Sequence, residues 1–317
     1  MSLARYVATR IAALLLTVLV GSVAVFLVMK AAPGDPAVAA LGENARPELV
    51  AAFRAKHNLD VPWAVQYGRW LAAAARGDFG LSLTVAADRP IASLIAARLP
   101  NTIFVGALAL VLAVALSLFA GTIAALHRGR AADTVATSLA ALGISMPDFW
   151  LSYVLILVLA LGLGLFPAYG FTAPSQSLVG ALHSGFLPAL AVAAPLAAVF
   201  SRTLRTALLE SSHRDYVVAA RSFGFHPAFV FVHWIFRNAL IPYITIIGLQ
   251  IRYILGGVVV IERIFGIAGI GSLMVDGAFA RDYPVVQACA VVFLVLVLSV
   301  NLLVDVACSL LDPRRSR

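Results

Sequence analysis

The sequence predicts an all-α integral membrane protein with six transmembrane helices. Of its 317 residues, 62% are hydrophobic and only 12% are charged, whereas a soluble domain is about half apolar and a quarter charged. A helix needs about 20 apolar residues to cross a hydrocarbon core of about 30 Å. The stretches of sufficient length are residues 9–31, 101–126, 135–166, 186–209, 239–261 and 285–308.

The first and third stretches carry special features. The first has the basic flank of a signal peptide, Arg5 and Arg10. Its apolar part exceeds the usual length, however, and no A-x-A-like cleavage site follows before Pro33, so we expect a retained anchor. The third stretch is long enough for Pro147–Asp148 to break or kink it.

Positive charges predict the orientation, because Lys and Arg in short loops are retained on the cytoplasmic side. With both termini in the cytoplasm, the short outer loops carry only Arg263 and Arg281. The cytoplasmic side then carries Arg5, Arg10, Arg128, Arg130, Arg202, Arg205, Arg214, Arg221, Arg237, Arg314, Arg315 and Arg317. Because these residues are scattered between apolar runs, the formal charge of +8 indicates membrane topology and no nucleic-acid partner.

In this orientation, residues 32–98 form the one sizeable segment on the outer side of the membrane. Prolines at favourable first positions predict helices at 47–57 and 62–75 within it. The second helix carries aromatic residues at spacings of three and four, namely Trp63, Tyr67 and Trp70. We expect this face to dock on the membrane interface or on a neighbouring subunit.

The sequence lacks the motifs of an enzyme or of a nucleotide-binding subunit. Neither of its two lysines, Lys30 and Lys56, follows a glycine, so no phosphate-binding P-loop is present. No Ser/His/Asp or Cys/His set is recognisable, and the six histidines lack zinc-type spacing. Cys289 and Cys308 share the last apolar run, which favours small packed side chains over a disulfide or metal pair. We expect no catalytic residue, no metal and no cofactor in this chain.

The longest cytoplasmic loop, residues 210–238, reads as two short helices. Asp215 is placed to accept hydrogen bonds from the first turn of the first helix. The pair Ala219–Ala220 gives that helix a small surface, which another protein could approach closely. Gly224 suits the left-handed residue that closes a helix, and Pro227 suits the first position of the next.

These residues resemble the coupling loop of ABC importer permeases, in the variant typical of the dipeptide/oligopeptide/nickel family. The matching loop residues are Asp215, Tyr216, Val217, Ala219, Ala220, Arg221, Gly224, His233, Arg237, Asn238, Ala239 and Pro242. Other matches run along the chain at residues 33–36, 59–67, 77–82, 98–102, 257–271, 281–284, 301, 305 and 312–314. Val218 departs from an expected acidic residue, and Ala268 from an expected proline.

The resemblance implies a type I ABC importer permease fold, with residues 1–317 forming a single transmembrane domain in the bacterial cytoplasmic (inner) membrane. It implies a second homologous permease, two ABC ATPase subunits that hold ATP and Mg, and an extracytoplasmic solute-binding protein as partners. The family's substrates are dipeptides and oligopeptides, with nickel chelates, glutathione, sugars and opines as alternatives. An ion-driven secondary transporter would show inverted repeats and buried mid-membrane acids, and a membrane scaffold would not need the loop.

The resemblance also assigns roles to residues. The predicted ATPase contacts are Asp215, Tyr216, Ala219, Ala220, Arg221, Gly224, His233 and Asn238. The predicted translocation path or gate contains Arg252, Gly256, Gly257 and Glu262; the two glycines either loosen the fifth helix near the gate or allow close packing of helices. A charge in mid-span is costly unless it faces a cavity or a partner. Arg252 therefore either lines the path or pairs with an acidic side chain of this or the other permease.

The outer loop 263–284 is predicted to face the docked binding protein and to lie near the gate. Its predicted contact residues are Phe265, Gly269, Gly271 and Asp282. Glycines 266, 269 and 271 are expected to supply unusual backbone angles.

Overall fold

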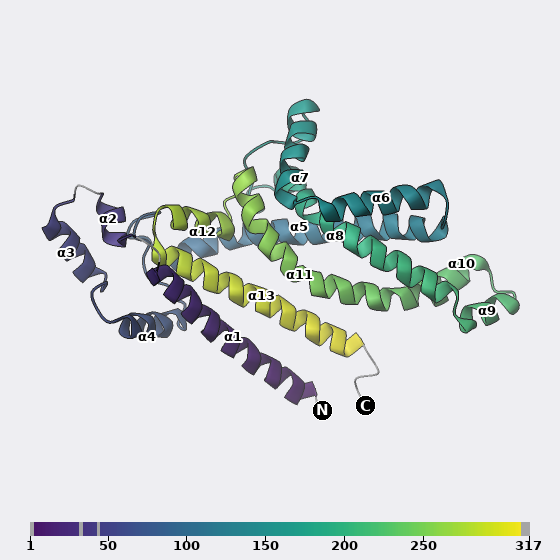
Figure 1. Ribbon diagram of the computed structural model, residues 1–317, viewed down its shortest axis with the longest axis horizontal. Helices are drawn as coiled ribbons and strands as arrows, with labels where there is room; N and C mark the ends of the chain where they lie inside the picture. The colour runs from purple at the N-terminus through teal and green to yellow at the C-terminus, as the bar shows by residue number, and fades with distance from the viewer. Residues whose placement is uncertain (1–2, 32–33, 43–44, 312–317) are drawn as a thin grey trace. The chain divides into compact units, whose positions relative to one another are not determined.

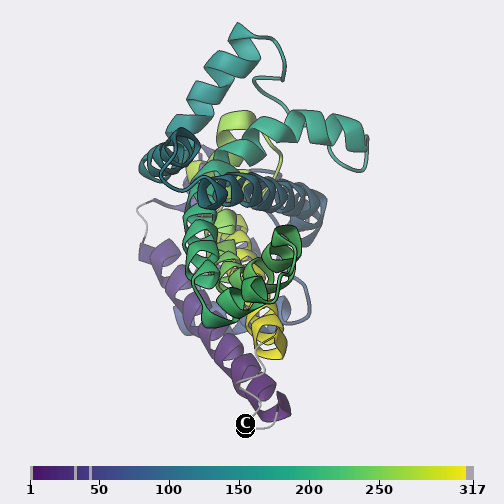
Figure 2. The same ribbon diagram turned by 90° about the vertical axis from the view of Figure 1, so that its right-hand side faces the viewer.

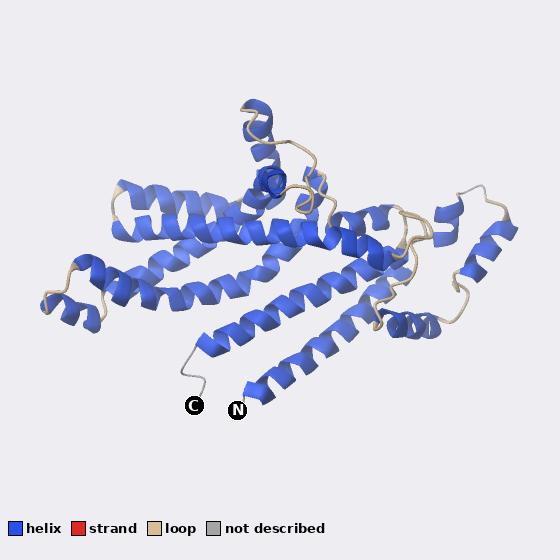
Figure 3. Ribbon diagram, turned by 180° about the vertical axis from the view of Figure 1, so that it is seen from behind, coloured by secondary structure: helices blue, strands red, loops and turns tan. Residues whose placement is uncertain are grey.

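A computed structural model describes residues 3–31, 34–42 and 45–311, and Figure 3 shows that their ordered elements are helices. Within these residues the only β-type pairing is an isolated bridge between Leu81 and Pro90. The predicted all-α fold is therefore confirmed. The predicted single transmembrane domain consists of two compact units, residues 1–102 with 266–299 and residues 103–265 with 300–317.

The first unit contains the outer segment and the helices that hold it. Its elements are α1 (Leu3–Ala31), α2 (Pro36–Leu41), α3 (Pro47–Lys56), α4 (Trp63–Ala74), the start of α5 (Ile91–Leu126), α12 (Ile270–Phe279) and most of α13 (Tyr283–Leu311). Helices α1 and α13 lie side by side (Figure 1), and a Cβ atom at Gly21 would collide with Leu294. A buried cluster that includes Ile91, Ile270 and Val285 joins α5, α12 and α13.

The aromatic face of α4 packs on α1. The Tyr67 ring lies 5.4 Å from the Phe26 ring, and its hydroxyl lies 2.8 Å from Ser22 Oγ. Trp63, at the start of the same helix, remains 56% exposed. Tyr67 thus packs on the chain's own first span, a contact that was not predicted, and docking of this face on the membrane interface or on another subunit stays a prediction.

The second unit is built around α8. Its elements are the rest of α5, α6 (Ala131–Ser145), α7 (Asp148–Leu155), the π-helical turn η1 (Ile156–Gly162), α8 (Leu178–Ser212), α9 (Asp215–Ser222), α10 (Pro227–Val230), η2 (Phe231–Phe236), α11 (Arg237–Phe265) and the end of α13. Of the apolar window of α8, 78% is buried, against 11–33% in the other long helices, so α8 is the central one. Small residues allow this, since a Cβ at Gly121 would lie 2.8 Å from the Ser201 carbonyl oxygen.

The predicted break in the third stretch is confirmed. Helix α6 ends at Ser145 and α7 begins at Asp148, with a bend of 111° between the flanking helices (Figure 2). Among the described residues, five helices are long and apolar enough to span a membrane, and this bent pair passes the same test when it is counted as one broken span, which agrees with the six predicted spans. A second bent pair, residues 256–265 with 270–279, begins inside α11, which already contains the fifth predicted span.

Several helix boundaries differ from the prediction. Helix α5 begins at Ile91, ten residues ahead of the predicted start at 101. Pro100 lies within the helix and does not end it. The outer helices α3 and α4 match the predictions at 47–57 and 62–75. Helix α2 was not predicted; Asp35 caps it by accepting a 2.9 Å hydrogen bond from the Ala37 N–H. Helix α12 occupies a region that the sequence indicated as a loop.

Candidate functional site

The loop between α8 and α11 folds as predicted around Gly224. Helix α9 closes there because Gly224 takes a left-handed backbone angle, φ +77°. Its N–H donates to the Arg221 carbonyl at 3.0 Å, and the Phe225 N–H donates to the Ala220 carbonyl at 3.3 Å. Pro227 then begins α10, also as predicted. A side chain at Gly224 would meet no atom within 4 Å, so only the backbone angle requires glycine.

The start of the loop corrects one expectation. Asp215 is the first residue of α9 itself, with Arg214 in the capping position and no side-chain cap hydrogen bond. Because the helix begins at Asp215, its carboxylate adds negative charge to the first turn without accepting from it. Such a charge still favours the positive end of the helix dipole.

Helix α9 has a buried face and an exposed face. Val217 and Ala220 are buried, whereas Val218, Ala219 and Arg221 are exposed. Consecutive helical residues point about 100° apart, so the two alanines cannot share one surface. Only Ala219 offers the small exposed patch that the sequence suggested for the pair, while Ala220 packs inward.

Aromatic side chains brace α9 against the following helix. The Tyr216 ring stacks on Trp234, with centroids 6.1 Å apart. His233 stacks on Phe229 at 4.2 Å and is otherwise exposed. Asn238 is exposed, and its amide donates to the Trp234 carbonyl at 2.6 Å. Of these contacts, the stacking of Tyr216 on Trp234 joins the two halves of the loop, and the role of the loop residues in coupling stays a prediction.

The second half of the loop is not a separate short helix. Elements α10, η2 and α11 run without interruption from Pro227 to Phe265. The expected boundary near residue 239 is wrong, because the backbone keeps a helical path through the π-helical segment. The loop is therefore continuous with the fifth span.

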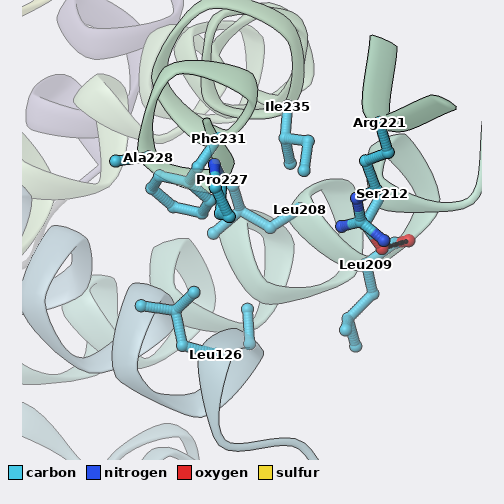
Figure 4. Close-up of a pocket in the computed structure, with 10 residues that line it drawn as sticks. Leu126, Leu208, Leu209, Ser212, Arg221, Pro227, Ala228, Phe231 and Ile235 are labelled. Carbon is cyan, nitrogen blue, oxygen red and sulfur yellow. Dashed lines mark hydrogen bonds between the residues drawn. The ribbon is translucent and has the colours of Figure 1, made fainter. Parts of the chain in front are cut away.

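A groove of about 610 Å³ runs beneath the loop. Leu126 at the end of α5 and Leu208 and Leu209 at the end of α8 form its apolar wall. Phe231 and Ile235 face them, and Figure 4 shows the Arg221 side chain reaching down beside Ser212. The groove combines apolar walls with a guanidinium donor at one end.

Two features of this region were not predicted as functional. Phe223, 82% exposed, and Phe225 project from the turn that follows α9. Large exposed aromatics in a loop outside the spans are a signal that could have been used. In addition, Arg205 of α8 donates to Asp133 of α6 through Nε at 2.7 Å and Nη2 at 2.8 Å. This bidentate pair fixes α6 to α8, and its spacing of 72 residues left no local signal.

The predicted path residues lie on α11. Arg252 is exposed, and none of the ion pairs found among the described residues involves it. Gly256 is open, whereas a Cβ at Gly257 would lie 2.9 Å from Asp148 Oδ2, so α7 approaches α11 closely there. Glu262 is completely buried. The roles of these residues in a path or gate stay predictions.

The outer loop 263–284 buries all four of its predicted contact residues. Phe265, Gly269 and Gly271 are buried, and of the three glycines at 266, 269 and 271 only Gly266 has a positive φ, +67°. Gly269 is extended and Gly271 lies inside α12, so their expected unusual angles are wrong. The start of α12 is instead capped by the Ser272 hydroxyl, which accepts a hydrogen bond from the Gly269 N–H at 3.1 Å.

Asp282 is the most enclosed charge of this loop, with 0% of it exposed. Its Oδ2 accepts from the backbone N–H groups of Leu83, Thr84 and Val85 at 2.9, 2.9 and 3.1 Å, and from the Ser82 hydroxyl at 2.6 Å. We name residues 82–85 with Asp282 the Asp282 clasp. The carboxylate is thus committed to holding the outer segment, and a contact of Asp282 with a binding protein stays a prediction.

These features define a multi-pass membrane protein whose fourth and fifth spans are joined by an exposed, rigidly closed helical turn. Two family models match the chain. The N-terminal component of binding-protein-dependent transport system membrane proteins matches residues 3–106, and the inner membrane component of these systems matches residues 117–317. The chain therefore belongs to the family of binding-protein-dependent transport system inner membrane components.

Similar proteins cover nearly the whole chain. A putative peptide transport system permease protein of Brucella abortus (strain 2308) is 37% identical over 96% of each chain. The oligopeptide transport system permease protein AppB of Bacillus subtilis (strain 168) is 38% identical over 91% of this chain and 92% of its own. The glutathione transport system permease protein GsiC of Escherichia coli (strain K12) is 36% identical over 97% of each.

A solved structure supports the fold. The crystal structure of an amino acid ABC transporter with histidines contains a chain with a TM-score of 0.51 and 16% identity. The match covers 67% of this chain and 92% of that one.

Proposed function

We propose that this chain is a permease subunit of an ATP-driven importer, which forms with a second homologous permease the path for peptides. The loop geometry carries the proposal: α9 buries Val217 and Ala220, exposes Ala219 and is closed by Gly224. Such an exposed, internally braced helix suits a groove on another protein. The names of the Brucella and Bacillus relatives support peptides as the solute.

The energy would come from two partner ATPase subunits, which would hold ATP and Mg. This chain would be non-catalytic, since neither of its lysines follows a glycine as a P-loop requires. An extracytoplasmic solute-binding protein would deliver the peptide, in keeping with the family's name. The distribution of arginine supports a position in the bacterial inner membrane with both termini in the cytoplasm.

Coupling would pass through the loop as a rigid body. Closure of the ATPases would push on residues 215–238, and the stacking of Tyr216 on Trp234 would transfer that push from α9 to η2. Because α10, η2 and α11 are continuous, the fifth span would move with it. The result is an alternating-access switch in which this subunit transmits motion.

Glutathione is the second candidate solute, because the Escherichia coli relative named for glutathione transport matches 97% of the chain. Both candidates are short peptides with a free carboxylate. Calorimetric titration of the associated solute-binding protein with dipeptides, longer peptides and glutathione separates them.

The Gly224→Val substitution tests the coupling role. A β-branched side chain at a left-handed angle costs roughly 1–3 kcal/mol, so we expect about a tenfold loss of ligand-stimulated ATP hydrolysis or of ATPase copurification. Gly164→Val is the matched control, since Gly164 has φ +65°, has equally open surroundings and lies after the third span on the other side. Normal hydrolysis and copurification in Gly224→Val would show that the loop does not couple.

A further inference from the structure

A second pocket lies in the first unit, where the outer segment packs on the ends of α1 and α13. It has a volume of about 350 Å³ and shares no lining residue with the groove beneath the coupling loop. Its walls come from the last turns of α1, from the turn before α4, from α4 and from the first turn of α13. Neither coupling nor the predicted path uses this pocket.

Two residues that line this pocket each carry a buried side-chain nitrogen for which the described part of the chain supplies no hydrogen-bond partner. These nitrogens are Trp70 Nε1 and Gln287 Nε2, and Gln287 is only 6% exposed. An indole N–H can only donate, so Trp70 requires an acceptor. A buried unpaired donor costs about 1–3 kcal/mol, and such exceptions in a folded protein call for a ligand or another explanation.

The charges of the pocket also favour an acceptor ligand. The Lys30 ammonium bonds to the Gln66 side-chain oxygen, and none of the ion pairs found among the described residues involves it. Arg69 adds a second cation to the lining. The acid in the lining, Asp78, already accepts from the Gly80 N–H at 2.9 Å. The pocket therefore favours a negatively charged ligand that carries hydrogen-bond acceptors.

The position of the pocket indicates a lipid as the source of that chemistry. The candidate span of α1 ends at Ala31 and that of α13 begins at Tyr283, so the pocket lies where hydrocarbon gives way to head groups. Phe26 and Met29 make part of its wall apolar. Beside them, Leu27 and Val28 of α1 are exposed and offer an acyl chain a surface.

We propose that this pocket binds the phosphate of a phospholipid head group, with the acyl chains lying along α1. A phosphodiester presents only acceptor oxygens, which match the donors of Trp70 and Gln287 and the charge of Lys30. The bound lipid would fasten α4 to the spans. The inference depends on α1 and α13 spanning the membrane and is independent of the transported solute; in the proposed orientation the lipid belongs to the outer leaflet.

Native mass spectrometry of the purified, delipidated chain tests the proposal by titration with palmitoyl-oleoyl phosphatidylglycerol. We expect one tightly retained lipid on the natural sequence. Trp70→Phe and Lys30→Met should each weaken it about tenfold, as the loss of one charged or buried hydrogen bond implies. Trp63→Phe, on the exposed start of the same helix, and Lys56→Met, at the other lysine, are matched controls that should leave binding unchanged. Equal retention by all five proteins would overturn the proposal.

Competition separates the sources of the acceptor. Diacylglycerol with the same chains should bind at least tenfold more weakly than the phospholipid, and inorganic phosphate or a dipeptide should not displace the lipid. Displacement by phosphate would show a soluble-anion site, displacement by a dipeptide would show a solute site, and either result contradicts the lipid proposal. Gln287→Met guards against misfolding, because it keeps the length of the side chain and removes the buried amide donor: we expect an unchanged or raised melting temperature and about tenfold weaker lipid binding. Retention of the lipid by this variant would count against the site. All readouts are independent of ATP hydrolysis, so failure here leaves the importer proposal untouched.

Discussion

The coupling loop, residues 210–238, and the outer loop, residues 263–284, use their family-like residues in opposite ways. In the coupling loop Ala219, Arg221 and His233 are exposed, and their neighbours hold the backbone in place. In the outer loop Phe265 and Asp282 are buried within the chain. The exposed motif residues of the coupling loop can therefore contact a partner directly. The buried motif residues of the outer loop instead fix the shape of the surface that a partner would contact.

The difference teaches how to interpret a charged residue in such a motif. Asp215 begins a short exposed helix and forms no cap bond, so its carboxylate remains open to another protein. Asp282 accepts bonds from the 82–85 backbone, and its loss would leave buried N–H groups unpaired. Substitutions in the outer loop should therefore damage folding first, and those in the coupling loop should damage assembly first.

Asp282→Ala is expected to have the largest effect. Removing the carboxylate leaves the Leu83, Thr84 and Val85 N–H groups without their acceptor, which should cost roughly 3 kcal/mol or more of stability. The measurements are thermal unfolding in detergent and the rate of proteolysis within residues 82–89. Asp78→Ala is the control, because that exposed carboxylate accepts one local bond from Gly80. Equal stability of the two variants would contradict the clasp.

A paired substitution on α9 sharpens the comparison within one helix. Leucine at the buried Ala220 should overpack the buried face of α9 and cost about 1–3 kcal/mol, whereas leucine at the exposed Ala219 should change stability by less than about 0.5 kcal/mol. Ala219→Leu should instead reduce ATPase copurification. Thermal unfolding and copurification of both variants give the test, and a stable Ala220→Leu protein would refute the assigned faces.

Local chemistry predicted the coupling loop better than the outer loop. Gly224 and Pro227 specify a helix end and a helix start by themselves, and both behave as expected. The Asp282 clasp could not be predicted, because its bonds join residues separated by up to 200 positions. Helix α12 was missed for a related reason, since its core contacts include Ile91 and Ile95 of a distant helix. Apolar length alone placed the spans, but it could not show that Pro100 lies inside α5.

Tyr216→Ala tests the bracing of the coupling loop. Loss of the stacking on Trp234 should cost about 0.5–1.5 kcal/mol and uncouple α9 from η2. Tyr216→Phe keeps the ring and should retain coupling. Hydrogen exchange of residues 215–222, with ligand-stimulated hydrolysis in the assembled transporter, distinguishes the two variants. If Tyr216→Ala keeps both values of the natural sequence, rigid transmission through this contact is wrong.

The smallest expected effect concerns pH and the outer segment. Burial lowers the pKa of His57, with the neighbouring Lys56 lowering it further and Asp88 opposing them, so the folded segment favours the neutral ring. The unfolded segment binds a proton near the ordinary value of about 6.5. At a pH between the lowered pKa of the folded segment and the ordinary pKa of the unfolded one, the unfolded state therefore holds more protons. The stability of the segment must then fall as the pH falls. Above about pH 7.5 the contribution is fully present.

Hydrogen exchange of α3 and α4 at pH 7.5 and 5.5, corrected for the intrinsic pH dependence of exchange, measures this effect. We expect the segment to open slightly more often at the lower pH, because protonation charges a partly buried imidazole beside the positive charge of Lys56. His57→Gln cannot titrate and should remove the difference, while the coupling loop should show no change linked to His57 in either protein. An acid-induced opening that persists in His57→Gln would assign the pH response to another group of the outer segment.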